Sequence, residues 1–176
     1  KCFIEEKFDY LRIAGLLEQD FNEKLSADRN GKFKEINDIF YNKMSEGVHL
    51  SRFKIYICNL FSELKFRNNT SDELKEFRKI RKNVGSVVTT NYDGLMESLF
   101  EFNKLIGNNI LLSNPYGSVY KIHGCHENPE RLIITEKDYL DFNNKYKLIR
   151  AQLLSLFIHN PIIFMGYSVN DEKKKK

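Results

Sequence analysis

Two short stretches of the sequence hold the polar residues best placed to do chemistry. The run Thr89–Asp93 (TTNYD) directly follows the apolar run 84–88, and the run Lys121–Gly124 (KIHG) directly follows Val119 and Tyr120. Each apolar run predicts a strand, so an Asn, an Asp and a His stand at predicted strand ends. In an open parallel sheet the carboxyl ends of the strands border the ligand crevice. The sequence therefore predicts that these side chains converge on one small molecule.

Each of these residues also has a purely structural interpretation. Asn91 could cap the helix that follows it, because a side-chain oxygen satisfies a free backbone N–H at a helix start. Asp93 could favour the positive end of the same helix. His123, which precedes a glycine, could be a hydrogen-bonded histidine at a turn. Both interpretations stay open for each residue alone, and the pairing of the two motifs favours the chemical one.

The first 80 residues show the spacing typical of helices. Apolar residues recur at helical intervals in several segments, and the clearest stripe must be buried against another element; it consists of Leu50, Phe53, Ile57, Leu60, Phe61 and Leu64. Polar breaks at 26–32 and 67–71 separate these helices. Ser71, followed by Asp72 and Glu73, predicts the start of a further helix that leads directly into a strand.

From residue 84 the pattern alternates between strands and helices. Runs at 84–90 and 118–122 predict strands, a helix is predicted at about 94–103 between them, and the turn-rich stretch that follows this helix allows a short extra strand at 110–112. Further helices are predicted at about 136–143 and 147–159, and a last buried strand at 162–165. This alternation indicates an α/β fold with a doubly wound parallel sheet.

Composition excludes several classes of protein. Hydrophobic residues make up 41% of the 176 residues and charged residues 30%, which is typical of a soluble globular protein, and no apolar run is long enough to span a membrane. The net charge of +4 equals the four lysines at 173–176, so the rest is neutral and direct nucleic-acid binding is not expected. The three cysteines show no CxxC spacing, which suits a reducing, cytoplasmic location.

Together with Gly166-Tyr167-Ser168, the two motifs resemble, in order, those of the sirtuin-like family, and in particular its bacterial NAD-hydrolysing branch. Further matches are Ile134-Thr135 with Asp138-Tyr139, and Asp171. The resemblance covers about half of the chain, from 84 to 171. It implies a Rossmann-like sheet that binds NAD at 83–171, a helical module of the same domain at 1–82, and a lysine tail at 172–176.

The resemblance also implies roles for single residues. Asn91 and His123 match the family's catalytic pair, and the residues implied in cofactor binding are Thr90, Asp93, Gly124, Gly166 and Ser168. Cleavage of the bond between nicotinamide and ribose builds oxocarbenium-like charge on the sugar, while the leaving group departs neutral. An Asn amide can orient water and a ribose hydroxyl, and a His can accept a proton from either.

Two departures from the family pattern affect the expected activity. The family's protein deacylases carry a zinc ribbon with paired CxxC motifs, whereas here that interval holds only Cys125, His126 and His159, from which four zinc ligands cannot be assembled. We therefore expect no zinc and favour hydrolysis of free NAD. The glycine-rich phosphate loop also has no counterpart, because Gly15 is flanked by helix formers, and we expect that loop upstream of Lys1.

The leading hypothesis is an NAD+ hydrolase that releases nicotinamide and ADP-ribose, as the effector domain of a larger bacterial antiphage protein. Its expected partners are NAD and either further copies of itself or other domains of that protein. The alternatives are a module that senses NAD or ADP-ribose without cleaving it, a zinc-free NAD-dependent deacylase, and a purely structural oligomerisation domain.

Overall fold

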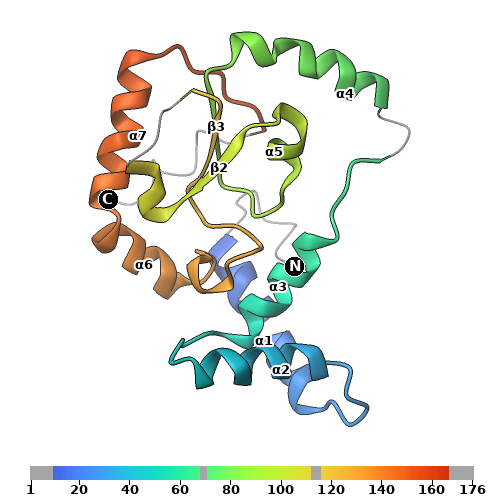
Figure 1. Cartoon of the computed structure of the whole chain (residues 1–176). Coiled ribbons are helices and arrows are strands. Elements are labelled where there is room, and N and C mark those ends of the chain that lie inside the picture. The colour runs from blue at the N-terminus through green and yellow to red at the C-terminus, as the bar shows by residue number, and fades with distance from the viewer. Residues whose placement is uncertain (1–9, 68–70, 112–115, 167–176) are drawn as a thin grey trace.

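The computed structural model describes residues 10–67, 71–111 and 116–166 (Figure 1). Ser168, Asp171 and the lysine tail lie outside the described residues. Among the described helices, none combines the length and apolarity that crossing a lipid bilayer requires.

Helices occupy the first half of the chain, as predicted. They are α1 (Tyr10–Ser26), α2 (Lys34–Ser45), α3 (Arg52–Ser62) and α4 (Ser71–Arg78), and a 3₁₀ helix (Lys79–Asn83) leads from α4 towards the first strand. Gly15 lies inside α1, which confirms its assignment as a helix residue. The predicted apolar stripe is buried only in part, because Phe53 and Ile57 are buried whereas Leu60 and Leu64 are nearly half exposed.

One of two hydrophobic clusters joins the helical half to the loops of the α/β half. Its centre is aromatic, with the Phe21 ring stacked on Tyr56 at 4.8 Å and meeting Phe33 edge-on at 5.4 Å between centroids. Leu132, which follows the third strand by eleven residues, is buried in the same cluster, and Tyr92 packs against it. The helical half therefore supports the loops that follow the strands.

The sheet has three parallel strands among the described residues, β1 (Ser86–Thr89), β2 (Asn103–Ile106) and β3 (Ser118–Lys121), in the order β1-β3-β2. The remaining helices are α5 (Leu95–Phe100), α6 (Glu136–Lys145) and α7 (Lys147–His159). Figure 1 shows α5 on one side of the strands and α7 on the other.

Side chains of the central strand point alternately to these two layers of helices. Tyr120 packs in a cluster with Ile149 and Leu153 of α7, whereas its neighbour Lys121 reaches Glu97 of α5. All four residues of β3 are buried, as a strand covered on both faces requires. The predicted α/β fold with a doubly wound parallel sheet and N-terminal helices is confirmed.

The prediction was wrong between the first and the third strand. The helix expected at 94–103 ends at Phe100, because Glu101 takes a left-handed conformation (φ 52°) that reverses the chain, and the unpredicted strand β2 follows at Asn103. The extra strand expected at 110–112 is also wrong where the structure describes it, since Gly107–Leu111 form a 3₁₀ helix.

The last buried strand, expected at 162–165, is not formed. These residues have no strand assignment, and their exposed fractions run from 39% for Ile162 to 85% for Ile163. Their apolar character predicts burial, but a strand also needs a hydrogen-bonded neighbour. Among the described residues, the three-stranded sheet does not extend to them.

Candidate functional site

The two predicted site loops leave the sheet side by side. In the parallel register Thr89 is level with Lys121, and beyond the ladder Ile122 N–H donates to the Thr89 carbonyl at 3.1 Å. Further on, His126 N–H donates to the Tyr92 carbonyl at 2.9 Å, so the loops stay joined. Two residues beyond the last paired positions, one strand reaches Asn91 and the other His123. The fold brings these two residues to the same edge of the sheet.

Asn91 does not cap the helix that follows it. Leu95 N–H donates to Asp93 Oδ1 at 3.0 Å, so the carboxylate of Asp93 binds the start of α5. Asn91 donates its own backbone N–H to the Thr89 hydroxyl at 3.1 Å, and the residue is exposed. The amide of Asn91 is therefore not used as a helix cap. Thr90, which lies between Thr89 and Asn91 in the chain, is half-buried.

Lys121, a buried lysine that the sequence did not single out, binds the loop of Asn91 through the backbone of that loop. Lys121 at the end of β3 is 1% exposed, and its ammonium group donates to the Asp93 carbonyl and pairs with Glu97 Oε1 at 2.9 Å. Asp93 itself is buried. Because a charge buried in this way needs its partners, Lys121 fixes the turn between β1 and α5. Its position inside the KIHG motif was the available signal.

His123 is packed between aromatic rings. Its ring meets Tyr139 edge-on at 5.2 Å and Phe142 at 6.0 Å between centroids, and the Tyr139 hydroxyl lies 3.4 Å from His123 Nδ1. Burial lowers the pKa of His123 from 6.5 to about 4, because a charged imidazole loses its hydration there. The imidazole is thus neutral at physiological pH and can accept a proton.

The glycine after His123 is required by the backbone. Gly124 has φ 92°, and a Cβ at this position would lie 2.5 Å from the Arg131 carbonyl oxygen. Gly124 thus lets the loop pass close to the segment before Leu132. Gly166 also has a positive φ of 64°, but it is exposed and an added Cβ would meet no atom within 4 Å. No hydrogen bond among the described residues joins Gly166 to the two loops.

A partly buried ion pair joins the helical half to the segment after β3. Lys54 of α3 pairs with Asp138 at 2.6 Å and donates to the Leu132 carbonyl at 2.8 Å. Burial raises the pKa of Asp138, but the Lys54 ammonium and hydrogen bonds from Thr135 more than offset this, so the pKa lies below its usual value. Thr135 and Asp138 form a capping box at the start of α6. Their spacing in the sequence is the signal that would have revealed it.

Three adjacent potential metal ligands lie in the loop after Gly124. One ligand atom each of Cys125, His126 and Glu127 lies within 4.8 Å of the others. Glu127 is already paired with Lys104, and Cys125 is buried. Three ligand residues fall short of the four that a structural zinc site uses. The absence of zinc stays a prediction.

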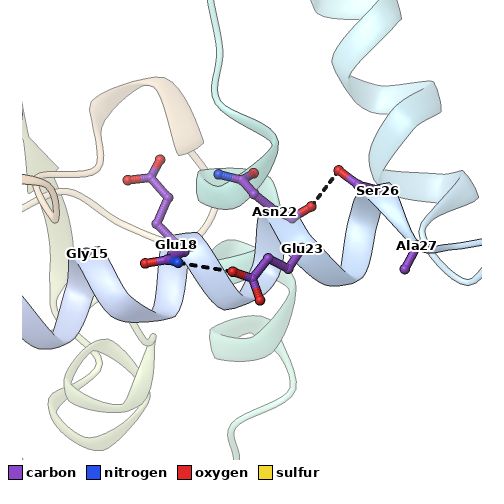
Figure 2. A pocket seen from close by; sticks show the side chains of 7 residues that line it. Gly15, Glu18, Asn22, Glu23, Ser26 and Ala27 are labelled. Carbon is purple, nitrogen blue, oxygen red and sulfur yellow. Dashed lines mark hydrogen bonds between the residues drawn. The ribbon is translucent and has the colours of Figure 1, made fainter.

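Two concave surfaces of the described residues lie away from these loops. One runs along α1 (Figure 2) and is lined by Gly15, Glu18, Gln19, Asn22, Glu23, Ser26 and Ala27. Its side chains largely bond within their own helix, as Gln19 Nε2 donates to Glu23 at 3.0 Å. The other lies at the amino ends of β1 and β3, beside Gly85 and Gly117. Neither contains the loops of Asn91 and His123.

Two comparisons with known proteins find relatives of this chain. The family model described as SIR2-like domain matches residues 85–175, just over half of the chain. The chain is also similar to the defense-associated sirtuin 2 of Bacillus subtilis, with 25% identity over 177 residues. That alignment covers 93% of this chain and 17% of the relative, so the chain spans less than a fifth of the relative's length.

Proposed function

Because the chain belongs to the family of SIR2-like domains, we propose that it hydrolyses NAD+ to nicotinamide and ADP-ribose, with Asn91 and His123 as its catalytic pair. One observation carries the proposal. The adjacent strands β1 and β3 end level with each other, and each delivers one of these residues two positions later. An amide and a neutral imidazole at one sheet edge are the groups that this reaction needs.

The chemical demand falls on the ribose. As the bond to nicotinamide breaks, positive charge develops on the sugar, and the neutral nicotinamide leaves without needing a strong acid. The Asn91 amide has one acceptor and two donors, so it can hold a ribose hydroxyl and the attacking water at once. Its exposure and freedom from helix capping leave it available for this task.

His123 acts as the general base in this proposal. A pKa near 4 keeps the imidazole unprotonated at neutral pH, although it also makes the imidazole a weak base. A weak base suffices, because charge on the oxocarbenium-like sugar makes its hydroxyls and the incoming water more acidic. The attacking water gives its proton to the imidazole as the water oxygen forms the new bond to the anomeric carbon, which leaves ADP-ribose with a hydroxyl there.

Binding of NAD involves further residues in this proposal, namely Thr90, Asp93, Gly124, Gly166 and Ser168. Asp93 and Gly124 also have structural tasks, at the start of α5 and at the close approach to Arg131. Their contacts with NAD would therefore come from the backbone of the loops that they shape. The reaction is proposed to need no zinc.

The biological role follows from the relative. The name of the Bacillus subtilis protein places it in defence, and this chain aligns with a small part of it. We infer that the chain is the effector domain of a larger bacterial antiphage protein, which depletes cytoplasmic NAD on infection. Assembly with further copies of itself, or with other domains of that protein, is part of the same proposal.

The test is release of free nicotinamide from NAD by the full-length protein. Asn91→Ala and His123→Ala are each expected to lower turnover by at least about 100-fold, on the usual scale for a general base or an orienting group. Matched controls are Asn42→Ala in α2 and His49→Ala in the loop before α3, which change the same residue types at exposed positions of the helical half. The controls are expected to keep wild-type turnover.

The alternatives give different results in the same assay. A sensor module would bind NAD without releasing nicotinamide, and a deacylase would release nicotinamide only when an acylated peptide is present. Wild-type turnover in both Asn91→Ala and His123→Ala would refute the assignment of the catalytic pair.

A further inference from the structure

The side chain of His123 is oriented by α6, and the sheet holds only its backbone. The His123 carbonyl accepts from Ile133 N–H at 3.0 Å, which fixes the loop but leaves the ring free to turn. Tyr139 and Phe142, three positions apart and thus on one face of α6, meet the imidazole edge-on at 86° and 81°. These two rings define the plane in which the imidazole can lie.

Tyr139 brings a polar atom to one nitrogen of this ring. Its hydroxyl lies 3.4 Å from Nδ1, a long hydrogen bond of the kind that tightens when substrate binds. A neutral imidazole has one N–H donor and one acceptor nitrogen, and the partner of one nitrogen decides where the proton sits. If Tyr139 accepts from Nδ1–H, the lone pair lies on Nε2, the other ring nitrogen.

The start of α6 is itself anchored next to Tyr139. Asp138 completes the capping box with Thr135, and its other oxygen pairs with Lys54 at 2.6 Å, with both side chains less than one-fifth exposed. Lys54 also holds the Leu132 carbonyl, one residue before the segment that bonds to His123. Helix α3 thus fixes both the loop of His123 and the helix that contacts its ring.

We propose that Tyr139 is the positioning residue for His123: its hydroxyl accepts the Nδ1 proton, fixes the imidazole tautomer and so presents Nε2 as the base, on an α6 that Lys54 and Asp138 lock to the helical half. The inference rests on the proposed function for its catalytic meaning. The orientation of the imidazole can nevertheless be measured whether or not NAD is cleaved.

The first measurement is the tautomer of His123, by nuclear magnetic resonance of the full-length protein with isotopically labelled histidine. The signals are assigned by their loss in His123→Gln. At neutral pH the wild type is expected to carry its proton on Nδ1, and Tyr139→Phe is expected to shift it towards Nε2. A wild-type proton on Nε2, or the same tautomer in both proteins, would overturn the proposal.

The second measurement is the rate of nicotinamide release. Tyr139→Phe is expected to lower kcat about 10-fold, as loss of an orienting contact to a reactive imidazole does, while the KM for NAD stays unchanged. Tyr146→Phe is the matched control, because Tyr146 stacks on Phe142 at 5.0 Å in the same aromatic group and should leave kcat unchanged.

The two measurements separate the two proposals. No nicotinamide release by the wild type, either alone or in extract of phage-infected cells, refutes the hydrolase, while the tautomer comparison still decides the role of Tyr139. Full kcat in Tyr139→Phe, in an active enzyme, refutes the positioning role alone. A fall in kcat that Tyr146→Phe reproduces would also refute it, because the effect would then belong to the aromatic packing.

Discussion

The loops that follow β1 and β3 leave the same edge of the sheet, but their site residues differ in how many contacts they make. Around His123 the ring has two aromatic neighbours, and the next residue is a glycine pressed against the backbone at Arg131. Asn91 is exposed, and within the described part of the chain its one hydrogen bond runs from its backbone N–H to the Thr89 hydroxyl, whereas Asp93 binds the start of α5.

Within the proposed catalytic pair, His123 is therefore the preorganised residue and Asn91 the adaptable one. In the proposed reaction the imidazole of His123 would be held in place before NAD binds, whereas the exposed amide of Asn91 would be ordered by its contacts with the ribose and water. A rigid base avoids reorganisation in the transition state, and a free amide can adapt to a substrate whose ribose changes shape during reaction. Substitutions in the β3 loop should therefore cost stability, and those at Asn91 should cost activity alone.

The largest loss of stability is expected from the lysine that joins the two loops. Lys121→Met leaves Glu97 charged without its partner and the Asp93 carbonyl without its donor, which should lower the free energy of unfolding by about 3–5 kcal/mol. Urea denaturation measures this. Lys104→Met, which breaks the more exposed pair with Glu127, should cost less than about 1 kcal/mol. Equal losses in the two variants would contradict the role of Lys121.

A pair of glycines compares the two loops directly. Gly124→Ala combines left-handed strain with a Cβ only 2.5 Å from the Arg131 oxygen, and should cost about 3 kcal/mol. Gly94→Ala, at the start of α5, has an ordinary φ of −98° and a nearest contact of 3.7 Å, so it should be nearly neutral. Thermal unfolding of both variants checks this. Similar melting temperatures would show that the loops are equally tolerant.

Acidification should destabilise the protein through His123. Its folded pKa of about 4 lies below the ordinary 6.5, so between these values the unfolded chain binds more protons and stability falls as the pH is lowered. The loss amounts to at most about 3 kcal/mol from pH 6.5 to 4. Urea denaturation across this range measures it.

The same titration in His123→Gln should lack this part of the pH dependence. Asp138, whose pKa lies below its usual value, is present in both proteins, so its own loss of stability towards low pH cancels in this comparison. An unchanged pH dependence in His123→Gln would assign the loss to other groups.

The smallest effect on stability is expected at Asn91. Asn91→Ala should change the free energy of unfolding by less than about 0.5 kcal/mol, because the side chain is exposed and caps no helix. Denaturation in urea and nicotinamide release are measured on the same sample. A stability loss comparable with that of Gly124→Ala would show that Asn91 is a structural residue.

The sequence predicted those features that depend on local pattern. Helical spacing identified α1 to α4, and the apolar runs at 84–90 and 118–122 located β1 and β3, together with the residues at their ends. These signals are local, because periodicity and apolar runs reflect the burial of neighbouring positions. The family motifs, at the same strand ends, led to the same sheet edge.

The features that the sequence did not reveal depend on distant partners. Strand β2 begins with two exposed polar residues, Asn103 and Lys104, so it shows no apolar run, and it pairs with β3 after Glu101 reverses the chain. The contact between His123 and Tyr139 joins a loop to a helix, and the pair of Lys54 with Asp138 spans 84 residues. At 162–165 the sequence predicted a strand that is not formed. Apolar residues there favour burial, but a strand forms only where the edge of a sheet is available to pair with it.

Cys58 gives the helical half an internal reporter. The side chain is buried in α3, and burial raises the pKa of its thiol to about 12, so almost no reactive thiolate is present at neutral pH. An alkylating reagent can modify it only after the packed helices separate. The labelling rate of Cys58, followed by mass spectrometry, would then report how often this core opens locally. It would also show whether bound nucleotide slows that opening.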